Sequence, residues 1–146
     1  MSSKRVTTFA RLVLVVFSAV AFASGCSLAA PSAPSTSTPN RTTESFEGSF
    51  TYQNSKSHAF TVTEPGLVEV NLTSVGPLTT MAIGVAVGTW ANDTCTNLNI
   101  RNTAARTGSA ALSGTAAAGS YCVNLFDSGN LPSNWTVTYT VSVTHP

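Results

Sequence analysis

Polar and apolar residues alternate along most of the chain, and the alternation is clearest near the C-terminus. In the segment 135–144, Trp135 and every second residue after it are apolar, whereas the positions between them are Thr or Ser. Successive side chains of a β-strand point to opposite faces, so this pattern predicts a strand with one buried face. The same period of two recurs in 58–63 and 66–75, joined by a turn at Glu64-Pro65-Gly66.

Three further segments have strand-like patterns. Phe46, Phe50 and Tyr52 indicate an opening strand, and 120–126 indicates another. In 81–88, Met, Ile and Val alternate with Ala and Gly. Glycine inside a strand often marks the close approach of a backbone or an aromatic ring, so we expect a packing role for this bare face rather than a ligand site.

No stretch has the spacing of an amphipathic helix. The nearest candidate is the alanine-rich segment 110–118, which Ser113-Gly114-Thr115 interrupts. Turn residues recur at short, fairly regular intervals between the predicted strands. The sequence therefore predicts an all-β domain, an antiparallel β-sandwich of seven to eight strands, with either a jelly-roll or an immunoglobulin-like strand order.

The N-terminal segment has the pattern of an export signal. Three basic residues precede the apolar run 12–23, which is shorter than the roughly 20 residues needed to span a bilayer. We therefore expect residues 1–25 to be a cleaved signal peptide.

Cys26 follows the small residues of Ala23-Ser24-Gly25, and this stretch resembles the lipobox of bacterial lipoproteins. In that pattern Leu usually occupies the position of Ala23. The resemblance implies acyl chains such as palmitate on Cys26 and a membrane-anchored protein of the cell envelope, facing the periplasm or the exterior. The alternative is ordinary cleavage after Ala23 or Ala29, which would release a secreted, soluble protein.

The chain has three cysteines, and a lipid on Cys26 leaves an even pair, Cys95 and Cys122. We expect these two to form a disulfide in an oxidising compartment, the alternative being two buried free thiols. The segment 26–44 is rich in Pro, Ser and Thr and is predicted to be a tether. Residues 45–146 then form the domain.

Charge is sparse in this protein. Asp, Glu, Lys and Arg make up 9% of the chain, against about 25% in ordinary globular proteins. After Cys26, four basic residues stand against six acidic ones, a net charge of −2. Because no basic stripe can follow a phosphate backbone, nucleic acid is not an expected partner.

Residues suited to catalysis are few. His58 and His145 are expected to be an exposed strand residue and a frayed terminal residue, and neither accompanies a nucleophile motif. Paired carboxylates would have to come from acids that lie beside turns or on polar strand faces, where solvated side chains are the simpler interpretation. These acids are Glu47, Glu64, Glu69, Asp93 and Asp127.

Ligand sites are equally sparse. Asp93 and Asp127 are weak candidates for a calcium site, and no spacing of ligands suits zinc or a phosphate, so no cofactor or metal is predicted. Aromatic rings on a β-sandwich can stack on sugars. Trp90 is the candidate for such a site, while Trp135 is assigned to the core, and Tyr52 and Tyr121 complete the aromatic set considered.

The domain resembles the pre-peptidase C-terminal type of bacterial β-sandwich. The residues that carry the resemblance are HAFTVTEPGLVEVNLTSV (58–75), GTW (88–90), GSYCVNLFDSGNL (119–131) and YTVSVTHP (139–146). The resemblance implies an accessory module without catalysis. The function expected is that of a non-enzymatic envelope lipoprotein with a structural or protein-interaction module and an envelope protein or polysaccharide as partner. The alternatives are a carbohydrate-binding module and, more distantly, an enzyme with an unrecognised site.

Overall fold

The structure is a computed structural model that describes residues 40–146, except for the side chains of residues 97–99. This part of the chain forms eight strands and no helix, so it holds no helix able to cross a membrane. The strands are β1 (Thr42–Thr51), β2 (Ser55–Val62), β3 (Gly66–Gly76), β4 (Ile83–Ala91), β5 (Thr94–Ala105), β6 (Ala110–Ala116), β7 (Gly119–Phe126) and β8 (Thr136–His145). Strand β1 begins inside the segment expected to be a tether.

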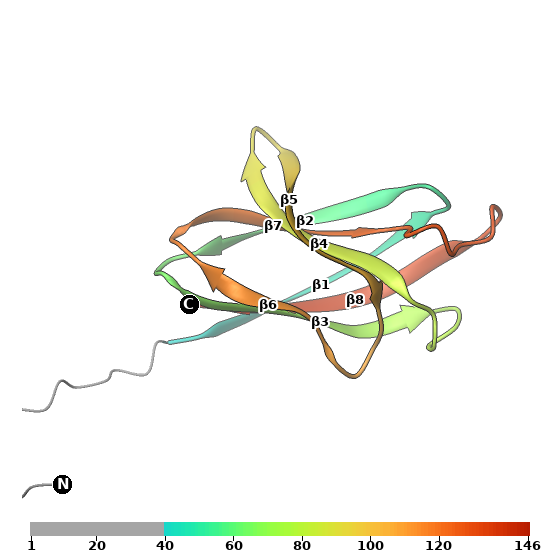
Figure 1. Cartoon of the computed structure of the whole chain (residues 1–146), viewed down its shortest axis with the longest axis horizontal. Helices are drawn as coiled ribbons and strands as arrows, with labels where there is room; N and C mark the ends of the chain where they lie inside the picture. The colour runs from blue at the N-terminus through green and yellow to red at the C-terminus, as the bar shows by residue number, and fades with distance from the viewer. Residues whose placement is uncertain (1–39) are drawn as a thin grey trace, which may run out of the picture. The chain divides into compact units, whose positions relative to one another are not determined.

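Two four-stranded antiparallel sheets pack face to face, which confirms the predicted β-sandwich (Figure 1). The strand order is β1-β8-β3-β6 in the first sheet and β2-β7-β4-β5 in the second. The chain thus pairs β1 with β8, β2 with β7, β3 with β6 and β4 with β5, as when one long antiparallel ribbon is wrapped around a barrel. This is the jelly-roll order, so the structure decides between the two topologies that the sequence left open.

Strand β8 provides the centre of the core. Val137, Tyr139, Val141 and Val143 are all buried, and each faces the opposite sheet, as the alternation predicted. Trp135 departs from the expected core set, because it lies before the strand and is only half-buried. Its backbone N–H donates to the carbonyl oxygen of Pro132 at 3.0 Å, so a turn precedes β8 at this point.

Both faces of β4 are buried around its glycines. A Cβ at Gly84 would collide with the ring of Phe126, and one at Gly88 would collide with the carbonyl oxygen of Thr96. The expected packing role of the bare face is therefore confirmed.

The disulfide between Cys95 and Cys122 explains the second glycine. It joins β5 to β7, which lie on either side of β4, with the two Cα atoms 5.9 Å apart. A Cβ at Gly88 would lie 3.1 Å from the sulfur of Cys122, so the bond runs over a position that has no side chain. Closing a loop with a sequence separation of 27 stabilises the fold by about 3.5 kcal/mol in the chain-entropy model.

Strands β5 and β6 were not predicted. Strand β5 is polar, and its pairing with β4 contains two register shifts, so it shows no steady alternation. The alanine-rich segment considered as a helix forms β6, which pairs with β3 along one edge. Pairing with a neighbouring strand therefore determined the structure of this segment, not its local helix propensity.

Two glycine substitutions test this packing. Gly88→Ala is expected to lower the free energy of unfolding by about 1–3 kcal/mol, because the added methyl group meets fixed backbone. Gly114→Ala is the matched control in another strand, where an added Cβ has no atom within 4 Å. It should raise the free energy of unfolding by about 0.5–1 kcal/mol. Urea denaturation followed by tryptophan fluorescence measures both, and equal effects would contradict the packing described.

Candidate functional site

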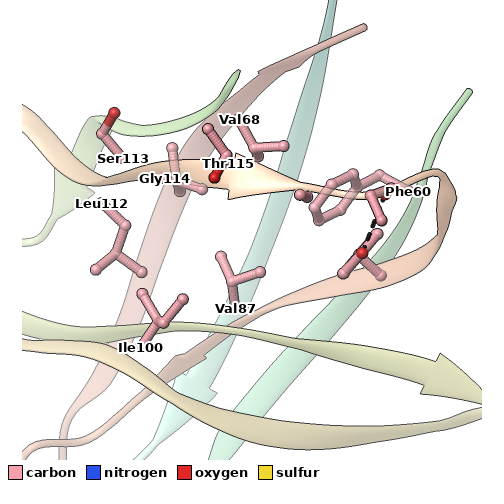
Figure 2. A pocket seen from close by; sticks show the side chains of 12 residues that line it. Phe60, Val68, Val87, Ile100, Leu112, Ser113, Gly114 and Thr115 are labelled. Carbon is pink, nitrogen blue, oxygen red and sulfur yellow. Dashed lines mark hydrogen bonds between the residues drawn. The ribbon is translucent and has the colours of Figure 1, made fainter. Parts of the chain in front are cut away.

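An apolar pocket opens between the two sheets, on the side where β5 and β6 are edge strands (Figure 2). Its volume is about 190 Å³. An engineered apolar cavity of about 150 Å³ is known to hold benzene, so this pocket has room for one apolar side chain or ring. The lining residues are Phe60, Val68, Val70, Val87, Ile100, Leu112, Ser113, Gly114, Thr115, Ala116, Ala117 and Tyr121.

Gly114 is the residue that leaves the pocket open. In the ladder between β3 and β6 it lies opposite Val68, a core residue, and directly opposed residues of an antiparallel pair share a face. Gly114 therefore points between the sheets. No atom lies within 4 Å of the position of its absent Cβ, and its φ is not in the left-handed region. Neither crowding nor backbone conformation requires glycine here.

The free edge of β6 adjoins the pocket. Strand β6 has one neighbour, β3, so alternate N–H and C=O groups along it point away from the sheet. Its sequence, AALSGTA, has no charged residue and no proline. The other three edge strands carry charges that discourage pairing: Glu44 and Glu47 in β1, Lys56 in β2 and Arg101 in β5.

The opposite side of the sandwich is closed by histidine contacts. His58 stacks on Phe46 with ring centroids 5.1 Å apart, and its Nε2 lies 2.8 Å from the hydroxyl oxygen of Tyr139 in the other sheet. Burial, and then the charge of Lys56, lowers the pKa of His58. Burial also raises the pKa of Tyr139 to about 12. The prediction of an exposed His58 is therefore wrong, because the residue faces between the sheets and is half-buried.

His145 is buried, and the prediction of a frayed terminal residue is wrong. Its Nε2 lies 2.9 Å from Oε1 of Glu44, and its Nδ1 lies 3.0 Å from the backbone oxygen of Pro146. The strand ladder between β1 and β8 continues to the pair Thr42 and His145. Pairing with β1 therefore fixes this end of β8.

The two acids considered for calcium do not meet. Asp127 follows β7, whose Phe126 pairs with Gly84 near the start of β4, whereas Asp93 follows the end of β4. At about 3.3 Å per residue, β4 separates them by roughly 25 Å. Within residues 40–146, no three His, Cys, Asp or Glu side chains gather into a metal site.

The carboxylate of Asp127 has a structural role instead. It accepts hydrogen bonds from the backbone N–H groups of Gln53, Gly129, Asn130 and Leu131 at 2.8–3.3 Å. Burial acts to raise the pKa of Asp127, but the four donors outweigh it and lower the pKa. Asp93 has positive φ in the two-residue turn between β4 and β5. Each acid therefore shapes a loop.

The remaining acids do not form a catalytic pair. Glu69 pairs with Arg41 at 2.7 Å on the first sheet. Glu47 and Glu64 are exposed on β1 and on the turn before β3. Every buried side-chain nitrogen or oxygen in the described region has a hydrogen-bond partner. No orphaned polar atom in this region points to a bound group.

The aromatic residues considered for sugar binding lie at different places in the sandwich. Trp90 is half-buried at the end of β4, paired with Cys95 in the hairpin that projects at the top of Figure 1. Tyr52 directly follows β1 and Trp135 directly precedes β8, so both adjoin the last pair of that ladder, Thr51 and Thr136. Tyr121 lines the pocket and stacks on Phe60. Trp90, the residue predicted from the sequence, remains the candidate.

The pocket is not predicted by the sequence. Its signal in the sequence is Gly114, which the local pattern presents only as an interruption of a helix. Cys26, the signal peptide and most of the tether lie outside the described residues, so the structure does not test lipidation.

The contacts of His58 predict a pH dependence of stability. Its pKa in the folded state lies below the ordinary value of 6.5, so the unfolded chain takes up a proton first as the pH falls. The free energy of unfolding should therefore decrease below about pH 6.5, by at most about 1.4 kcal/mol per pH unit from this group. Urea denaturation of wild type and His58→Gln between pH 7 and pH 5 isolates the effect. Parallel pH profiles would contradict it.

No protein-family model matches the chain, and no curated protein matches it. The resemblance to pre-peptidase C-terminal domains therefore remains a prediction.

Proposed function

We propose that this chain is a cell-envelope lipoprotein whose β-sandwich is a protein-interaction module without catalytic activity. The observation that carries the proposal is the combination of an uncharged, unpaired edge strand, β6, with an apolar pocket at Gly114. An exposed sheet edge binds another strand through backbone hydrogen bonds, and a pocket beside it adds specificity for one side chain.

The ionisable residues support a module without catalysis. The imidazoles of His58 and His145 bond to Tyr139 and Glu44, and the carboxylate of Asp127 accepts four backbone donors. Each of these groups therefore holds parts of the fold together. The pocket is lined mainly by apolar side chains, and the hydroxyl of Tyr121 at its rim donates to the carbonyl oxygen of Ala117 at 3.0 Å.

The disulfide supports a place outside the cytoplasm. Bonds such as that between Cys95 and Cys122 persist in oxidising compartments and are rare in the reducing cytosol. The export signal in residues 1–25 agrees with this location. Cys26, directly after that signal, is the residue proposed to carry the lipid.

A carbohydrate-binding module is the second candidate. It rests on Trp90, which is half-buried at the end of β4 in the hairpin that projects from the sandwich. A single ring gives a sugar one stacking surface. The β6 edge offers alternate backbone donors and acceptors beside the pocket, although the carbonyl oxygen of Ala111 already accepts from the side-chain amide of Asn102 at 3.0 Å. Protein binding is therefore the better-supported function.

The anchor is tested by Cys26→Ala in the full-length chain. Wild type should sediment with membranes and have an intact mass above that of the polypeptide starting at Cys26. The variant should lose the added mass and leave the membrane fraction. Recovery of unacylated wild type in the culture supernatant would overturn the anchoring.

The interaction surface is tested with a photo-crosslinking amino acid at Thr115, which is exposed on β6. In cells that produce the full-length chain, ultraviolet light should yield a protein adduct of defined mass, because a partner strand on this edge lies beside the probe. The matched control places the probe at Ser49, which is exposed on the edge strand β1.

No adduct at Thr115, or the same adducts at both positions, would contradict the proposed function. Retention on a polysaccharide that Trp90→Ala abolishes, together with no adduct at Thr115, would establish the carbohydrate-binding alternative instead.

A further inference from the structure

We infer that the partner of the β6 edge is a second copy of this chain. The two β6 strands pair antiparallel with Ser113 on the two-fold axis, and the partner's Leu112 covers Gly114 at the mouth of the pocket. The inference rests on the proposed function, since it names the partner of the same surface.

The distribution of charge favours a second copy at this edge. Pairing two copies through β1 would bring together the acids Glu44 and Glu47, and pairing through β2 or β5 would bring together Lys56 or Arg101. Such edge charges act against edge-to-edge pairing, and like charges directly opposite each other are destabilising. Strand β6 has no charge to repel its own copy.

The register follows from the residues of β6. Directly opposed residues in an antiparallel pair point to the same face, and Gly114 faces the space between the sheets. The sequence AALSGTA contains one large apolar side chain, Leu112, which also lines the pocket. With Ser113 on the axis, Leu112 of each copy lies opposite Gly114 of the other. An axis at Leu112 would instead place the partner's Ala110 opposite Gly114. An axis at Gly114 would place the partner's glycine there.

An exposed apolar side chain lies beside the same pocket. Ile100 is 48% exposed and lines the pocket from β5 (Figure 2). A large apolar side chain is stabilised when a partner removes it from water. A second copy at β6 brings its Leu112 to the pocket that Ile100 lines.

The assembly closes at two copies. A two-fold interface uses the same surface on both partners, so the free edge of β6 is paired in both copies. The joined sheet has the order β1-β8-β3-β6 followed by its reverse, and its outer strands are the acidic β1 strands. Further growth is therefore blocked by charge. One strand pair buries little surface, so pairing depends on the high local concentration that a common membrane provides.

The test introduces single cysteines into the full-length chain in intact cells. Ser113→Cys places two thiols directly opposite each other, with Cα atoms about 5 Å apart, which a disulfide can bridge. Thr115→Cys is the matched control, because Thr115 is also exposed on the same strand. Its two copies would lie about 13 Å apart along the strands, beyond the reach of a disulfide. Non-reducing electrophoresis should show roughly tenfold more covalent dimer for Ser113→Cys than for Thr115→Cys.

A second variant tests the pocket. Adding Gly114→Val to Ser113→Cys fills the space that the partner's Leu112 requires, while the added Cβ meets no atom of its own chain. The dimer yield should fall several-fold with the unfolding transition retained. An unchanged yield would overturn the role of Leu112.

Two other outcomes separate the inference from the proposed function. Equal dimer yields for the two cysteine variants, or none, would overturn the second copy as partner. The proposed function would still stand if the probe at Thr115 captured a different protein, and both would fail if it captured none.

Discussion

Packing of the two sheets against each other through the apolar face of β8 is the constraint on which the rest of the structure depends. Val137, Val141 and Val143 are fully removed from water, and β8 lies between β1 and β3 in the first sheet. Burying such side chains contributes about 1.5–3 kcal/mol each, an upper estimate that ignores structure in the unfolded chain. In the observed jelly-roll order, β8 pairs with both β1 and β3, so its inward side chains lie at the centre of the first sheet.

The two open sides of this sandwich are built differently. Between β1 and β2, histidine side chains meet aromatic rings of the other sheet. His58 bonds to the hydroxyl of Tyr139, and the ring centroids of His145 and Phe60 lie 5.4 Å apart. These contacts link the two sheets along this side of the sandwich. Between β5 and β6, small side chains and Gly114 leave a pocket instead. The molecule is therefore closed on the side that carries its histidines and accessible on the side that carries none.

The edge strands differ in whether they carry a charged residue. In a domain with so few charged residues, each of the edge strands β1, β2 and β5 still carries at least one, and β6 does not. An uncharged edge does not discourage pairing with another strand, and this difference from the other edges is the basis of the proposed interaction. The disulfide that runs over Gly88 holds β5 and β7 together and so keeps one wall of that pocket in place.

The sequence by itself determined the fold class, most of the strands and the packing role of the glycines in β4, because alternation with a period of two reports burial of one face directly. The pairing of Cys95 with Cys122 also followed from counting cysteines. The sequence did not predict strands β5 and β6. A bulged polar strand and a run of small residues acquire their conformation from the strands with which they pair.

Only the tertiary structure decided the environments of the histidines and the existence of the pocket. His58 is in phase with the buried Phe60, and His145 with the buried Val143, so the alternation already places both on inward faces. Their contacts with Tyr139 and Glu44 come from residues distant in the chain. Gly114 looks like a helix interruption until β3 places it opposite Val68. The physical reason is the same in each case: strand pairing joins residues far apart in the sequence, and a local pattern carries no information about which strands will be neighbours.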